Sequence, residues 1–313
     1  EFRGEMPFKN VYFTGIVRDK LGRKMSKSLG NSPDPLGLID KYGADGVRMG
    51  MLLSAPAGND ILFDEQLCQQ GAAFCNKIWN AFRLVKGWEV SETLEQPSEN
   101  KRTIAWMEAV IKTAVAEIND LYSKYRLNEA LMSVFKLFTD EFSGWYLEMI
   151  KPAYQAPIDA ATFKATLEFF EQLMKIVHPF MPFITEELYQ HIAERKDGES
   201  IMTERLQVTS VSEDESSLWD DFAVAKSVIA SVRAIRNQNN ISPKELLSLQ
   251  VVGKNPIATL DDVVLKMANL SSLDVVDSKG DGTVSFLVGT TEYAVFIGNL
   301  INADEEIAKM EAE

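Results

Sequence analysis

The chain has 313 residues, of which 46% are hydrophobic and 25% charged, a composition typical of a globular protein with room for two or three domains. Its formal net charge of −14 argues against indiscriminate nucleic-acid binding, because the average field of such a molecule repels a polyanion. No apolar run approaches the roughly 20 residues of a membrane span, and two histidines and two cysteines without a CxxC pair leave too few ligands for a structural zinc site. We therefore expect a cytoplasmic protein with no membrane span and no metal site.

The first part of the chain, residues 1–63, predicts a small α/β segment. β-Branched and aromatic residues favour a strand over 11–17. Proline and glycine spacing predicts two short helices over 35–43 and 44–54, followed by a short strand or an extended turn in NDILFD, residues 59–64. Because the chain begins in mid-pattern without an initiator methionine, we expect it to be a fragment.

Residues 64–238 predict a bundle of amphipathic helices joined by short polar connections. Apolar residues recur at helical spacing over 64–86, 101–123, 127–151, 160–177, 182–195 and 219–238. Cys68 and Cys75 share a face of the first of these helices but lie about 10 Å apart along its axis, too far to form a disulfide. We expect two buried thiols.

Beyond residue 238 the hydrophobic period changes from about 3.6 to 2. This change predicts a small α+β module over 239–300, and residues 301–313 read as the start of a charged helix. The predicted elements of the module are strands over 246–252, 272–276, 283–289 and 292–298 and a helix over 261–270. The fold class expected for the whole chain is mainly α.

Positive charge is concentrated in the stretch GRKMSKSLGN, residues 22–31. Lysines in a glycine-bounded loop can close over a polyphosphate, while the hydroxyls of Ser26 and Ser28 donate hydrogen bonds to its oxygens. The alternative is a solvated basic loop without a ligand, which is the usual fate of a run of charge. Composition alone favours that alternative.

The letters of this stretch favour the phosphate-binding interpretation. KMSKS followed by LGN resembles the signature loop of the class I aminoacyl-tRNA synthetases, and the flanking PFKNVYFTGIVRDKLG, DPLGLIDKYGADGVRM and NKIWNAFRLV resemble the valyl-tRNA synthetase family. The resemblance implies a catalytic role for Lys24 and Lys27 at the phosphates of ATP, with Met25, Ser26 and Ser28 completing the ATP-binding loop. It also implies ATP with Mg²⁺, valine and tRNA(Val) as substrates of a monomeric ligase.

The same resemblance extends into the predicted bundle. HPFMPFITEELYQ, residues 178–190, is similar to the anticodon-binding bundle of the valine, isoleucine, leucine, methionine and cysteine synthetases. It implies anticodon-loop contacts for Lys77 and Arg83 and contacts of Arg233 and Arg236 with the tRNA backbone. Solvated helix faces and intramolecular salt bridges are the alternatives for these four residues.

Other assignments remain open at this point. The HIGH-type tetrapeptide of the class I family is absent, so we expect the carboxyl-terminal part of a synthetase that is inactive by itself. An isoleucyl- or leucyl-type synthetase and a non-catalytic tRNA-binding helical module are the competing interpretations. His178 is expected to pack or cap at the corner between two helices, beside Pro179 and Pro182.

Overall fold

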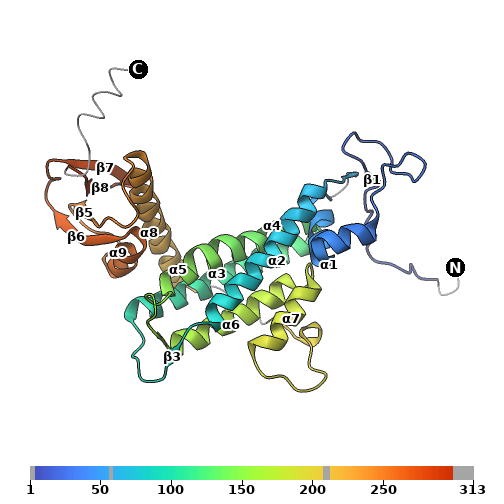
Figure 1. Cartoon of the computed structure of the whole chain (residues 1–313), viewed down its shortest axis with the longest axis horizontal. Coiled ribbons are helices and arrows are strands. Elements are labelled where there is room, and N and C mark those ends of the chain that lie inside the picture. Colours follow the sequence, from blue (N-terminus) through green and yellow to red (C-terminus); the bar gives the residue numbers. More distant parts are fainter. Residues whose placement is uncertain (1–3, 56–58, 207–211, 299–313) are drawn as a thin grey trace, which may run out of the picture. The chain divides into compact units, whose positions relative to one another are not determined.

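The computed structural model describes residues 4–55, 59–206 and 212–298 and divides into two compact units (Figure 1). The first unit comprises 1–96, 110–146 and 152–210, and the second comprises 97–109, 147–151 and 211–313. As predicted, the chain is mainly helical. None of the helices in the described part combines the length and apolarity that crossing a membrane requires. The helix start predicted for 301–313 lies outside the described residues.

The first unit opens with a minimal sheet, in which β1 (Val17–Arg18) pairs in parallel with β2 (Ile61–Leu62). The strand predicted over 11–17 is therefore wrong except at its last residue, because within the described ranges this two-residue ladder is the only pairing that the segment makes. Of the two alternatives for NDILFD, the short strand is the one observed, at Ile61–Leu62.

Helix α1 (Pro35–Leu53) joins the two predicted short helices. Gly43, with φ of 74°, forms a kink between them. The helix begins where the side chain of Asp34 accepts the backbone N–H groups of Leu36 and Gly37, and proline occupies its first position.

Helix α2 (Glu65–Lys86) packs along α1 at very close range. A Cβ atom added at Gly71 would lie 2.5 Å from the carbonyl oxygen of Gly46, and one at Gly50 would lie 2.6 Å from the backbone nitrogen of Cys68. The two backbones therefore touch where side chains would normally separate them.

Replacement of Gly71 by alanine is expected to destabilise the α1–α2 pair by about 1–3 kcal/mol, because the added methyl group must push two backbones apart. Native-state hydrogen exchange should show faster opening of α1 and α2 with unchanged exchange in helix α9 (Asp261–Ala268) of the second unit. Ala73→Gly, at an exposed position of the same helix, is the control and should cost only the smaller helix-propensity term. Equal exchange in Gly71→Ala and wild type would contradict the close-contact interpretation.

The remaining helices of the bundle follow in sequence, most of them where the hydrophobic period predicted them (Figure 1). They are α3 (Ser98–Ser123), α4 (Leu127–Lys136), the π-helix η1 (Leu137–Tyr146), α5 (Leu147–Ile150), α6 (Ala160–Val177) and α7 (Pro182–Ile192). Short strands β3 (Val90–Ser91) and β4 (Ile158–Asp159) pair in parallel, and a 3₁₀ turn, η2 (Ile201–Thr203), follows α7.

The single helix predicted over 127–151 thus contains a ten-residue π stretch, η1. Its core is aromatic: Phe142 meets Phe170 edge-on with ring centroids 5.2 Å apart, and Phe138 lies 5.5 Å from Phe142. Phe82 of α2 contacts the same ring of Phe170 at 5.6 Å. Such tilted and edge-on pairs add to the free energy of apolar burial.

Two side chains of α1 hold the corner between α6 and α7. The buried carboxylate of Asp45 accepts the backbone N–H of Ile184 over 2.7 Å, so it caps α7, and Arg48 Nε donates to the carbonyl of Phe180 over 3.0 Å. His178 Nδ1 lies 2.7 Å from Thr185 Oγ1, which agrees with a packing role at this corner. Burial lowers the pKa of His178.

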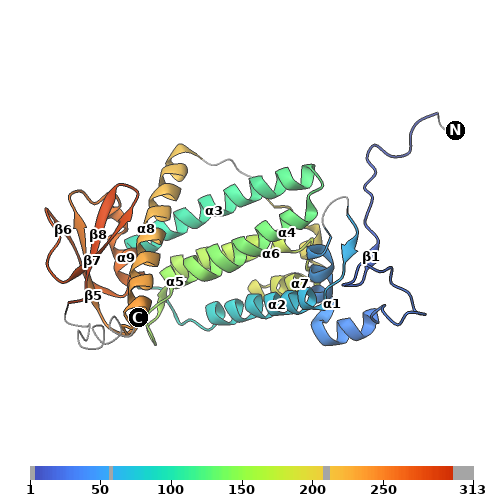
Figure 2. The same cartoon turned by 90° about the horizontal axis from the view of Figure 1, so that it is seen from above.

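The second unit contains α8 (Glu213–Gln238) and a four-stranded mixed sheet (Figure 2). The strands are β5 (Leu247–Val252), β6 (Leu270–Val276), β7 (Thr283–Val288) and β8 (Thr291–Phe296), in the order β6-β5-β8-β7. The 3₁₀ turn η3 (Ala258–Leu260) and helix α9 (Asp261–Ala268) connect β5 to its parallel neighbour β6. All four predicted strands and the predicted helix are confirmed.

Candidate functional site

Three of the five basic residues in the region 18–27 are neutralised by carboxylates. Arg18 pairs with Asp60, and Lys20 Nζ lies 2.8 Å from Asp64 Oδ1. Arg23 Nη2 lies 2.7 Å from Asp19 Oδ2. The hydrogen bonds from Arg18 and Lys20 lower the pKa of Asp60 and of Asp64, so both carboxylates stay charged at neutral pH.

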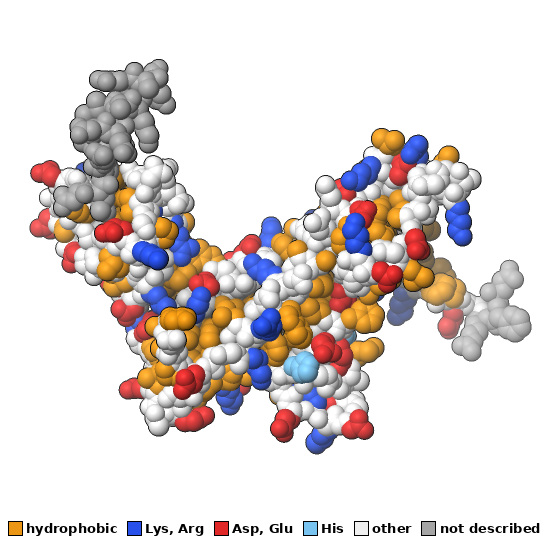
Figure 3. Space-filling view, viewed as in Figure 1, with side chains coloured by type: hydrophobic (Ala, Val, Ile, Leu, Met, Phe, Trp, Pro, Cys, Tyr) orange, Lys and Arg blue, Asp and Glu red, His pale blue; other side chains and the backbone are white. Residues whose placement is uncertain are grey.

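The other two basic residues are the lysines of the signature. Lys24 and Lys27 are exposed, and neither forms an ion pair within the described ranges. Basic side chains project from the loop beside β1 in the space-filling view (Figure 3). The fold therefore compensates the neighbouring positive charges and leaves these two ammonium groups for an external anion.

The rest of the signature shapes the loop. Half-buried Met25 packs against the small apolar cluster of Leu38, Phe63 and Cys68, which fixes the loop to the start of α1 and α2. The hydroxyls of Ser26 and Ser28 lie 3.1 Å apart, and Ser26 Oγ accepts the backbone N–H of Leu29 over 3.3 Å. Both hydroxyl groups thus lie within the turn that carries Lys27.

A second basic surface lies on α2. Lys77 and Arg83 are exposed, and Asn80 lies between them on the exposed half of the helix. No acidic residue occurs from 66 to 88, and neither cation forms an ion pair among the residues that the structure describes. Trp79 is 37% exposed at the edge of this surface. The surface offers two cations, an amide and part of an indole ring.

The two arginines of α8 have a different environment. Arg236 is only 5% exposed, and its guanidinium donates to four carbonyl oxygens, those of Ser242, Glu245, Ala268 and Asn269. Both terminal nitrogens of Arg236 are thus engaged inside the second unit, and its Nε is buried, so the structure argues against the predicted tRNA contact of Arg236. Arg233 is exposed, but Nη2 donates to the carbonyl of Met267 over 2.8 Å.

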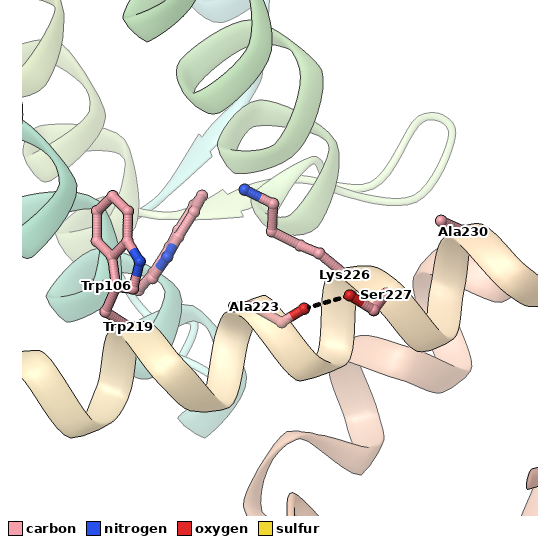
Figure 4. A pocket seen from close by; sticks show the side chains of 6 residues that line it. All are labelled: Trp106, Trp219, Ala223, Lys226, Ser227 and Ala230. Carbon is pink, nitrogen blue, oxygen red and sulfur yellow. Dashed lines mark hydrogen bonds between the residues drawn. The ribbon is translucent and has the colours of Figure 1, made fainter. Parts of the chain in front are cut away.

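A pocket of about 290 Å³ lies beside α8 in the second unit (Figure 4). Trp106, Trp219 and Lys226 line it together with small residues of α8, and the Ser227 hydroxyl donates to the carbonyl of Ala223 over 2.9 Å. Lys226 Nζ lies 5.3 Å from the centroid of the Trp106 ring, in a cation–π contact. The geometry by itself selects no ligand for this pocket.

The two cysteines of α2 are both free thiols. Cys68 is buried and Cys75 is partly buried, and neither is in a disulfide. Burial raises the pKa of the Cys75 thiol to about 12, so it is protonated at neutral pH.

Two residues of the loop escaped the sequence analysis. Asp19 and Asn31 contact each other at the base of the loop, with Asn31 Nδ2 3.0 Å from Asp19 Oδ2. A signal was present, because Asp19 is the only acid between residues 18 and 27 and Asn31 directly follows the second flanking glycine.

Comparison with family models assigns a class to both regions. Residues 1–64 match "tRNA synthetases class I (I, L, M and V)", and residues 105–251 match "Anticodon-binding domain of tRNA ligase". The chain thus joins the end of a class I tRNA synthetase catalytic domain to an anticodon-binding domain.

Curated relatives narrow this class. The chain is 63% identical over 313 residues to the valine–tRNA ligase of Phocaeicola vulgatus and 34% identical over 333 residues to that of Fusobacterium nucleatum. Over its whole length the chain thus corresponds to part of a valine–tRNA ligase. The match covers 100% of this chain but 35% of the Phocaeicola protein and 37% of the Fusobacterium protein.

A solved structure is also similar. It is a ternary complex of the Agrobacterium radiobacter K84 agnB2 LeuRS with tRNA and LeuAMS, at 16% sequence identity and a TM-score of 0.49. The similarity covers 88% of this chain and 33% of that one.

Proposed function

We propose that this chain works within a valine–tRNA ligase. Residues 22–31, the lysine loop, would contact the phosphates of ATP, and the basic surface of α2 would hold tRNA(Val). In the full enzyme valine would react with ATP to form valyl adenylate and pyrophosphate, and the valyl group would then pass to the terminal ribose of the tRNA. Mg²⁺ would accompany ATP as part of the substrate. We place this monomeric enzyme in the cytoplasm.

One observation carries the ATP assignment: among the described residues, Lys24 and Lys27 have no carboxylate partner, while Arg18, Lys20 and Arg23 have one each. A basic loop without a ligand gives no physical reason why three of its cations are ion-paired and the two signature lysines are not. Stabilising the charge that develops on departing pyrophosphate accelerates adenylate formation, whereas stabilising bound ATP alone does not. Ser26 and Ser28 would add hydroxyl donors to the same phosphates.

The tRNA assignment rests on the exposed half of α2. Lys77 and Arg83 sit in a stretch without acid in a chain of net charge −14, so this surface locally reverses the repulsion of RNA. Base recognition in single-stranded loops uses amides and aromatic rings, which Asn80 and Trp79 offer beside the two cations. Arg233 remains a proposed contact with the tRNA backbone.

The proposal also keeps the functional regions suggested by the sequence. Residues 1–63 would form the last part of the catalytic domain, 64–238 would bind the tRNA, and 239–300 would form an accessory module.

Substitution of Lys77 or Arg83 by alanine should weaken binding of tRNA(Val) about tenfold each, in a full-length ligase that carries this segment. If the lost side chain contacted a phosphate, the slope of log affinity against log salt concentration should also fall by about one. If it contacted a base, the variant should no longer prefer tRNA(Val) to a tRNA with an altered anticodon. Filter binding at several salt concentrations measures both.

Lys164→Ala is the matched control, because this lysine of α6 is 80% exposed and its nearest carboxylate oxygen is 3.9 Å away. It should bind tRNA(Val) like wild type. Unchanged affinity in both α2 variants would reject this surface as the tRNA contact.

A further inference from the structure

A single amide side chain holds both sides of the lysine loop. Asn31 Nδ2 donates to Asp19 Oδ2 over 3.0 Å and to the carbonyl oxygen of Lys24 over 3.3 Å. Asn31 Oδ1 accepts the backbone N–H of Ser26 over 2.9 Å. The backbone is therefore fixed immediately before and immediately after Met25.

Asp19 holds the loop from the other side, and we call the hydrogen-bonded pair of Asp19 and Asn31 the clasp. Its Oδ1 accepts the backbone N–H groups of Leu21 over 3.0 Å and of Arg23 over 2.9 Å, and its Oδ2 accepts Arg23 Nε over 2.8 Å. The bond from Asn31, followed by those from Arg23, holds the pKa of Asp19 well below its usual value. The carboxylate thus remains charged and keeps Arg23 occupied.

The clasp acts on the two signature lysines in different ways. The backbone of Lys24 is held directly, by Asn31 and by an antiparallel bridge to Arg18. Lys27 begins a turn in which its carbonyl accepts the N–H of Gly30 over 3.2 Å, and Gly30 has φ of 63°. This turn lies wholly between Ser26 and Asn31, the two residues that the clasp joins.

We propose that Asp19 and Asn31 are positioning residues for adenylate formation: they fix the loop so that Lys24 and Lys27 meet the phosphates of ATP. The inference rests on the proposed function. Neither side chain would touch ATP, since the polar atoms of both are engaged with the loop itself. Displacing a catalytic group by about 1 Å can reduce a rate 10²-fold, so the loss of the clasp should be visible in kinetics.

The test is Asn31→Ala in a full-length ligase carrying this segment. Valine-dependent pyrophosphate exchange should fall at least about tenfold in kcat, while the KM for valine stays unchanged. Trypsin should also cleave after Lys24 and Lys27 at least about tenfold faster in the absence of ATP, because the freed loop opens more often. Asn119→Ala, an exposed asparagine of α3, is the matched control.

Exchanging the acid and the amide between positions 19 and 31 distinguishes a positioning role of the pair from a general loss of structure. Asn31→Asp places two carboxylates against each other and should be as slow as Asn31→Ala. The double variant Asp19→Asn with Asn31→Asp restores a donor and an acceptor across the clasp, and should recover part of the exchange rate and of the resistance to trypsin.

If Asn31→Ala matches Asn119→Ala in exchange and in cleavage while Lys27→Ala is slow, the clasp is rejected and the proposed function stands. If the double variant is slower than either single change, the pairwise clasp is also rejected. If Lys27→Ala itself leaves exchange unchanged, the proposed function fails, and the clasp loses its catalytic purpose.

Discussion

Replacement of Lys27 by alanine is expected to slow valine-dependent pyrophosphate exchange about 10²-fold in a full-length ligase that carries this segment, as the loss of one transition-state donor does elsewhere. Lys27 is exposed on the turn closed by Gly30 and forms no ion pair within the described residues. Its charge is therefore available when negative charge develops on pyrophosphate. The fall should appear in kcat more than in the KM for ATP, since the interaction strengthens in the transition state.

Lys20→Ala is the control for this prediction. Lys20 lies in the same basic region, but its ammonium group is paired with Asp64 on the surface, and removing an exposed pair of this kind costs little. Exchange should stay close to the wild-type rate. A Lys27→Ala enzyme that is as fast as Lys20→Ala would show that total charge near the loop, and not this one ammonium group, is what matters.

Arg236→Ala is expected to destabilise the second unit by on the order of 3 kcal/mol or more. The buried guanidinium donates at 2.7 Å to the carbonyls of Glu245 and Asn269, and at longer range to those of Ser242 and Ala268. It thereby ties the end of α8 to the start of β5 and to the α9–β6 junction. Its removal leaves buried carbonyl oxygens without their charged donor.

Native-state hydrogen exchange is the appropriate measurement, because several units of one chain do not unfold in a single transition. Amides of β5, β6 and α9 should exchange at least about a hundredfold faster in the variant, while those of α2 and α6 keep their rates. Arg236→Lys should be almost as destabilised, because one ammonium group cannot serve four carbonyls. Lys244→Ala, at an exposed site nearby, should exchange like wild type, and equal rates in Arg236→Ala would refute the structural role.

The hydrophobic period was sufficient to predict most elements. Helices α2, α6 and α7 and strands β5 to β8 occur where the 3.6 and 2 periods placed them, since burial of one face is a local property of the sequence. The strand predicted over 11–17 failed because a strand needs a partner, and in the part of the chain that the structure describes its ladder spans two residues. The π stretch η1 also escaped prediction, because its apolar residues fit an ordinary helical pattern.

The candidate site, too, was predicted from the sequence only in part. The sequence alone indicated the loop of Lys24 to Ser28, through its signature, and the basic surface of α2, through the positions of its cations. The sequence could not distinguish Arg233 from Arg236, three residues apart on one helix, although Arg236 is buried among carbonyl groups that include those at the end of α9.

By itself the sequence determined the helical bundle and the α+β module, because these depend on residue type and short-range spacing. The lysine signature pointed to the tRNA synthetases through its resemblance to their loop. Only the tertiary structure decided which cations remain available for an anion. Arg18 finds Asp60 and Lys20 finds Asp64 more than 40 residues away along the chain. Whether a charge is compensated depends on what the fold brings within a few ångströms, and Coulomb energies fall too steeply with distance and solvent screening for composition to reveal it.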